Sequence, residues 1–150
     1  MKKIIIIITI LAFNISIDAQ TIDASKVPAI VKEGFAKHFA GVSGKWEKER
    51  DMYEVSFKQN NNKMSALFDA NGTITETEMA INSKDLPEPV ITYINGHYKG
   101  KKIEEASKIT KADGTVIYEA EVDEADLLFD VNGKFIKVEK QDKEEKNEQD

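Results

Sequence analysis

Apolar residues recur at steps of three and four along two short segments of the chain, and this spacing predicts two amphipathic helices. A proline near the start of each segment suits a first helical turn, with Ser25 and Asp85 as the expected N-cap residues. Each segment stops just before a glycine, Gly41 or Gly100, as helix C-termini often do. The apolar stripes consist of Val27, Ile30, Val31, Phe35, His38 and Phe39, and of Val90, Ile91, Ile94, His97 and Tyr98.

After each predicted helix, apolar and polar residues alternate at period two, which is typical of half-buried strands. Tight turns rich in glycine and asparagine separate the alternating runs, as they do in antiparallel hairpins. The predicted strands lie at about 45–49, 53–58, 64–68 and 73–80, and at about 102–109, 115–122, 125–130 and 134–140. The predicted class is α+β, with one helix and up to four antiparallel strands, twice.

The two helix-and-strand parts also share residues at equivalent places, which indicates an internal repeat. A shift of 59 residues places Pro28 on Pro87 and His38 on His97. We interpret 25–81 and 84–140 as two repeats, each under 60 residues long. An isolated core is marginal at that size, so the repeats should pack as one domain. Residues 141–150 contain no apolar side chain and should form a charged, disordered tail.

The first 19 residues have the pattern of a secretory signal peptide. Lys2 and Lys3 precede about ten apolar residues, and a polar break follows them. That run is shorter than the ~20 residues of a membrane-spanning helix, so we expect no stable span after the signal is removed. Cleavage after Ala19 would leave Gln20 as the first residue. These features predict a periplasmic or secreted protein.

Composition narrows the range of functions. The 150 residues include 27 acidic and 21 basic ones, for a net charge of −6 at pH 7. This balance argues against binding nucleic acid through a basic face. The absence of cysteine excludes disulfides, thiolate nucleophiles and cysteine-ligated zinc or iron–sulfur clusters. The sequence has no nucleophile elbow, zinc-protease motif or phosphate-binding glycine loop. We therefore expect no catalytic site, no metal and no cofactor.

Some polar residues could carry chemistry, but a structural role explains each of them better. His38 and His97 could form a metal pair or a pH switch. We favour histidines at helix ends that interact with the helix dipole. The two Asp-x-Asn-Gly turns lack the ligand spacing of a calcium loop. Glutamates paired along strands could supply carboxyls for glycoside hydrolysis, but they fit the wet faces of half-buried strands. These are Glu76 and Glu78, Glu104 and Glu105, and Glu119 and Glu121.

Aromatic residues are the candidates for binding. If both helices cover one face of the sheet, the other face lies in solvent, and aromatic side chains there would be recognition anchors. Trp46 stands between Lys45 and Glu47 in a polar strand, which favours exposure and core about equally. Tyr53 shares its face with Val55, and this fits a core position better. The candidate binding residues are Trp46, Tyr53 and Tyr118.

Taken together, these motifs resemble a family of secreted PepSY-like proteins described as similar to β-lactamase inhibitor protein. The resemblance lies in a Leu/Val-Pro helix start, an aromatic-x-Gly helix end, a Tyr-Glu strand and a Phe-Asp-x-Asn-Gly hairpin, all in duplicate. These are 27–28, 39–41, 53–55 and 68–72, and again 86–87, 98–100, 118–120 and 129–133. The resemblance implies one curved antiparallel sheet with helices on one face. It also implies a non-enzymatic envelope protein. The chain lacks the inhibitor's disulfide cysteines, so no contact residue carries over.

The sequence thus predicts a secreted, non-catalytic binding protein that uses its sheet face to hold an unknown envelope protein. One alternative is a peptidase regulator or inhibitor, since PepSY domains are thought to restrain peptidases. The other is a small-ligand carrier with a pocket between helix and sheet. Exposure of Trp46 would favour the protein binder.

Overall fold

The computed structural model describes residues 20–140, so the predicted signal peptide and C-terminal tail lie outside the described residues. The described chain has the helices α1 (Ala29–His38) and α2 (Glu88–His97), and short 3-10 turns at Ala24–Lys26 and Ser83–Asp85. Its strands are β1 (Gln20–Ile22), β2 (Gly44–Glu49), β3 (Met52–Gln59), β4 (Asn62–Phe68), β5 (Ile74–Ala80), β6 (Glu105–Lys111), β7 (Val116–Val122), β8 (Ala125–Asp130) and β9 (Phe135–Lys140). No helix within residues 20–140 is long and apolar enough to span a membrane.

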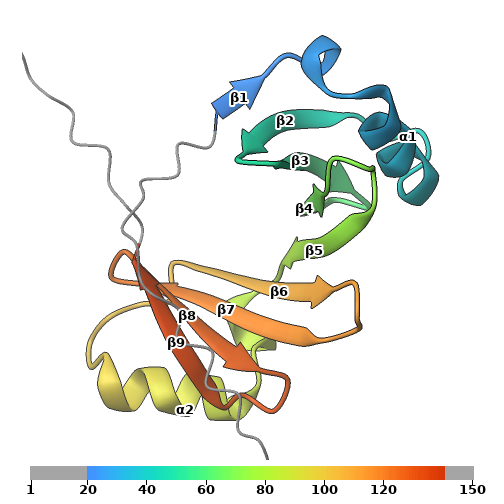
Figure 1. The fold of residues 1–150 in the computed structure, drawn as a ribbon. Coiled ribbons are helices and arrows are strands. Elements are labelled where there is room, and N and C mark those ends of the chain that lie inside the picture. Colours follow the sequence, from blue (N-terminus) through green and yellow to red (C-terminus); the bar gives the residue numbers. More distant parts are fainter. Residues whose placement is uncertain (1–19, 141–150) are drawn as a thin grey trace, which may run out of the picture.

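All of these strands form one antiparallel sheet in which each strand pairs with the next along the chain, from β1 to β9 (Figure 1). The predicted α+β class is confirmed, and a helix followed by four strands occurs in each half. Pairing of β5 with β6, with Glu78 opposite Ile109, joins the halves. The sequence pattern missed β1, whose three residues pair with β2 at the sheet edge.

Both helices lie on the same face of this sheet. Residues that are paired between neighbouring strands lie on the same face of the sheet. One row of such residues is Trp46, Val55, Ala66, Thr77 and Thr110, and another is Ala106, Ala120, Leu127 and Val138. Thr110 and Ala106 lie an even number of residues apart on β6, so both rows belong to one face. The sheet twists between the halves, and the helices therefore lie at different ends of the molecule (Figure 1).

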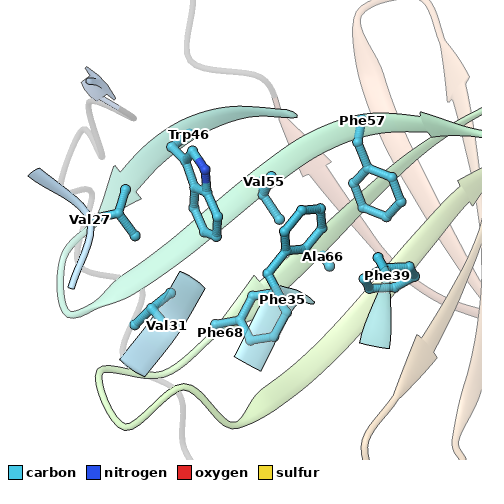
Figure 2. Packing of buried hydrophobic residues seen from close by; sticks show 9 residues of the cluster. All are labelled: Val27, Val31, Phe35, Phe39, Trp46, Val55, Phe57, Ala66 and Phe68. Atoms are coloured by element: carbon cyan, nitrogen blue, oxygen red, sulfur yellow. The ribbon is translucent and has the colours of Figure 1, made fainter. Parts of the chain in front are cut away.

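The core under α1 is built from aromatic rings that converge on Phe35 (Figure 2). The ring centroids of Trp46 and Phe57 lie 5.5 Å and 5.2 Å from that of Phe35, both edge-on, which is a favoured aromatic geometry. Trp46 is only 6% exposed. The hypothesis that Trp46 is an exposed recognition anchor is therefore wrong, because its indole faces the helix and fills the core.

The core under α2 is mostly aliphatic. It contains Leu86, Val90, Ile94, Ala106, Ala120, Val122, Leu127 and Phe129. Tyr93 lies at its margin, with its ring stacked between His97 at 4.0 Å and Phe135 at 4.7 Å. The buried side chains of the two halves form separate clusters under separate helices.

The helix starts differ from expectation. Ser25 and Asp85 lie inside the 3-10 turns, and Pro28 and Pro87 hold the N-cap positions without a side-chain cap. The chain makes a separate turn before each α-helix, and the extended backbone of each proline then leads into the first helical residue. The helix ends follow the prediction, since Gly41 and Gly100 have φ of +75° and +79°, which glycine adopts without strain.

The Asp-x-Asn-Gly segments are tight turns in both halves. The Asp69 carboxylate accepts hydrogen bonds from the backbone N–H of Asn71 and Thr73, each at 2.9 Å. Asp130 accepts the equivalent bonds from Asn132 and Lys134, also at 2.9 Å. These carboxylates thus hold the backbone of their own turns, which is the structural role expected for them.

Candidate binding face

The face of the sheet opposite the helices carries the candidate site, and we call it the open face. Its side chains alternate with the core residues along every strand. In the middle of the sheet they are Glu54, Ser56, Ser65, Leu67, Glu76, Glu78, Ser107, Ile109, Ile117, Glu119 and Leu128. Neither helix covers this face, because both pack on the other side of the sheet.

Three half-buried glutamates cross the open face, and we call them the acidic band: Glu54 on β3, Glu78 on β5 and Glu119 on β7. Their strands are two apart in the sheet, so neighbouring members lie on the order of 10 Å apart across the strands. The intervening strands place serine and aliphatic residues between them. Leu67 is paired with Glu54, and Ser107 is paired with Glu119.

Burial raises the pKa of all three carboxyls, because a charge loses solvation when it leaves water. The pKa of Glu119 rises to about 7, through burial first and then through repulsion from Glu78, Asp126 and Glu139. For Glu54 the Ser65 hydroxyl partly offsets the rise in pKa. The acidic band is therefore a line of carboxyls whose negative charge is poorly compensated.

Ser107 on β6 lies between Glu78 on β5 and Glu119 on β7. It is 5% exposed, and its Oγ has no hydrogen-bond partner. The hydroxyl is close enough to the Glu78 carboxyl to moderate the rise in that group's pKa, but the pair does not reach hydrogen-bond geometry. Buried polar groups in folded proteins are nearly always paired, so this hydroxyl stands out.

A hollow of about 710 Å³ opens along the first half of the open face. Its lining includes the acidic residues Glu54, Glu78 and Glu105, the serines Ser43, Ser56 and Ser65, and the lysines Lys45, Lys58 and Lys63. A smaller hollow of about 180 Å³ lies beside it, against Leu67 and four glutamates. Both hollows lie on the sheet surface, in contrast to the predicted alternative of a pocket between helix and sheet.

The other sequence-based candidates do not lie on the open face. Tyr53 is paired with Phe68 and Tyr118 with Phe129, and each tyrosine is half-buried against the core on the helix-bearing side. Because both side chains lie on the helix-bearing side of the sheet, Tyr53 and Tyr118 are not anchors of the open face. A binding role elsewhere remains a prediction for these two tyrosines.

The histidines end α1 and α2, one in each half. The Nδ1 of His97 lies 2.9 Å from the backbone carbonyl oxygen of Tyr93 and donates to it. Within residues 20–140, no three histidine, aspartate or glutamate side chains are placed to hold a metal ion. Both histidines lie in the last turn of their helices, and their interaction with the helix dipole stays a prediction.

The acidic band was missed because alternation assigns each glutamate to a face but says nothing about its burial. The sequence pattern predicts Glu78 and Glu119 on wet strand faces, whereas both are half-buried in the structure. A signal did exist. Serines alternate with glutamates on this face, and short side chains beside long ones allow the long ones to fold down onto the sheet.

Residues 14–75 and 51–137 match the family described as "Putative beta-lactamase-inhibitor-like, PepSY-like". A DUF2874 family protein of Bacteroides uniformis has a similar structure, with a TM-score of 0.67 and 17% identity over 75% of this chain and 88% of that one. No curated protein matches the sequence.

Two further solved structures share the fold. A Bacteroides eggerthii protein described as "putative periplasmic" gives a TM-score of 0.66 at 14% identity, over 75% of this chain and 88% of its own. A BLIP-like protein of Bacteroides fragilis gives 0.58 at 19% identity, over 75% and 84%. At such low identity the likeness is one of fold. The two family matches, in contrast, together extend over residues 14–137. The chain therefore belongs to the PepSY-like, β-lactamase-inhibitor-like family.

Proposed function

We propose that this protein is a non-catalytic binding protein of the cell envelope that holds a protein partner on its open face. The single observation behind this is that the helices leave one whole face of the sheet uncovered, while polar, charged and aliphatic side chains are mixed on it. Protein interfaces have this mixed composition. The family description, which names an inhibitor of an enzyme, supports the same kind of role.

Trp46 is buried, so the exposed aromatic expected of a protein binder is not the support for this proposal. The shape of the open face is what favours a protein over a small molecule. Small-ligand sites enclose most of their ligand in a concave, mainly apolar pocket. Here the space between helices and sheet is filled by side chains such as Val31, Val55, Phe68 and Leu127, which are fully buried. The hollow of about 710 Å³ lies on the open side instead and is lined by many charged residues. A peptidase would be one partner of this kind.

Two finer points belong to the proposal. The chain is exported by its leader and cleaved after Ala19, for which the charged and apolar pattern of residues 1–19 is the support. The halves are tandem repeats of one unit. Support comes from the recurring order of elements and from the matching Asp69 and Asp130 turns.

A photo-crosslinking experiment in living cells tests the proposed role. A benzoylphenylalanine residue would replace exposed Ser56 on the open face or, as the matched control, exposed Lys37 on α1. We expect a discrete crosslinked protein from position 56 and none from position 37. Crosslinks of equal yield from both positions, or from neither, would contradict a recognition role for the open face.

A further inference from the structure

Two ion pairs on the open face compensate charge, but neither includes a member of the acidic band. In the described residues, Lys111 Nζ lies 3.5 Å from Glu76 Oε2, and Lys137 pairs with Glu139. A third ion pair joins Lys101 to Asp123 in loops. Within residues 20–140 no lysine or arginine pairs with Glu54, Glu78 or Glu119, although all three are half-buried.

The buried, unpartnered hydroxyl of Ser107 is a second observation on this surface, independent of the carboxyl charges. Its hydroxyl is directly opposite Glu119 in the register and diagonal to Glu78 across β5 and β6. Residues directly opposite have Cβ atoms about 5 Å apart, and long side chains reach across the diagonal. A buried hydroxyl without a partner costs free energy, and this one lies where two carboxyls can approach the same point.

A lysine ammonium group fits these acceptors. It carries three hydrogen-bond donors and a positive charge, and the two carboxylates and the Ser107 oxygen provide three acceptors. Bonds of this kind, between charged donors and acceptors, are the strong ones. Glutamate side chains at half-buried positions can change rotamer, so the carboxyls of Glu78 and Glu119 can turn toward an incoming cation and uncover the hydroxyl.

We propose that the partner places a lysine-rich segment on the acidic band, with one ammonium group docked at Ser107 between Glu78 and Glu119. This inference rests on the proposed function, because it names the chemistry of the partner held on the open face. Members of the band are on the order of 10 Å apart, so several lysines of one segment can each meet a carboxylate. Charge complementarity of this kind gives specificity and orients the partner.

A binding titration with a defined probe tests the inference. The purified, exported protein would be titrated with a fluorescent hexalysine peptide, and separately with the same peptide acetylated on every lysine. We expect the charged peptide to bind and the acetylated peptide to bind at least tenfold more weakly, since acetylation removes the charge. Equal binding of the two peptides would overturn the inference.

Variants locate the binding site. Glu119→Gln and Glu78→Gln should each weaken hexalysine binding by about tenfold, as expected for a partly buried charge pair. Glu33→Gln, on the exposed surface of α1, removes the same charge from the other side of the molecule and should change the affinity less than about twofold. Equal losses in all three variants would mean attraction to net charge alone and would overturn the site.

Ser107→Ala separates binding from folding. Loss of an unpartnered buried hydroxyl should leave the melting temperature unchanged or raise it, while hexalysine binding falls severalfold. Unchanged binding by Ser107→Ala would overturn the docking point. Failure of the hexalysine tests alongside a crosslink from position 56 would leave the proposed function standing with a partner of other chemistry. Failure of both would remove the proposed function as well.

Discussion

The two halves of the molecule have the same order of helix and strands but fill their cores with different side chains. Trp46 and Ala106 hold corresponding places, each on the first strand after a helix, opposite Val55 and Ala120 respectively. One half therefore has an indole where the other has a methyl group. Alternation and turns therefore determine the topology, while side-chain volume can be distributed in several ways among the core positions.

The two halves also differ in what lies between the helix and the strands and turns that it packs against. In the first half Gly34 of α1 lies against Gly72, and a Cβ on Gly34 would lie 2.2 Å from the Gly72 carbonyl oxygen. The corresponding residue of α2 is Tyr93, whose ring lies between His97 and Phe135. Backbone therefore touches backbone in the first half, whereas an aromatic side chain covers the margin of the core in the second.

The largest effect should come from Trp46→Ala, which leaves a cavity in the aromatic core. We expect a loss of about 3–5 kcal/mol in the free energy of unfolding, measured by urea denaturation. The counterpart in the second half, Ala106→Gly, should cost only about 1 kcal/mol. A loss below about 1 kcal/mol for Trp46→Ala would contradict its place in the core.

A smaller effect should separate the two helical glycines. Gly34→Ala forces a methyl group into the backbone of Gly72 and should destabilise by about 1–3 kcal/mol, as overpacking does. Gly96→Ala in α2 meets nothing within 4 Å and should stabilise by up to about 1 kcal/mol. Thermal melts of both variants measure the contrast, and two changes of the same sign would show that the halves dock their helices alike.

The smallest effect concerns pH and the open face shared by both halves. The folded pKa of Glu119 is about 7, above its ordinary value of 4.5, so ionisation is less favourable in the folded state. The resulting penalty is absent below pH 4.5, grows as the pH rises to 7 and is complete above it. Melting temperature should therefore fall by a few degrees between pH 5 and pH 8.

Glu119→Gln should flatten this dependence, and Glu33→Gln should leave it intact. The charged groups around Glu119 on the neighbouring strands are Glu76, Glu78, Lys111, Glu105, Asp126, Lys137 and Glu139. If the Glu119→Gln protein still loses stability with rising pH as steeply as the parent protein, the pH dependence comes from these neighbouring groups instead.

The sequence was sufficient for the topology because hairpin turns and period-two alternation are local signals. The Gly41 and Gly100 helix ends and most strands are close to where the pattern placed them, whereas β6 begins at Glu105 and ends at Lys111, two to three residues later than predicted. The sequence pattern did not place Trp46 in the core. Its charged neighbours Lys45 and Glu47 belong to the opposite face of the strand and indicate the polarity of that face only. The pattern could not find Ser107 and the acidic band either, because alternation alone does not give the register between strands, above all between β5 and β6, which α2 separates in the sequence.

The strictly sequential pairing from β1 to β9 also has a consequence for how the chain acquires its structure. Each strand finds its partner across a short turn or, for β5 and β6, across one helix, so most native pairs are close in sequence. Such low contact order favours rapid folding for an all-antiparallel sheet. A chain that becomes available from its N-terminus first can thus add one hairpin at a time to a growing edge. It need not wait for a distant segment before its first core closes.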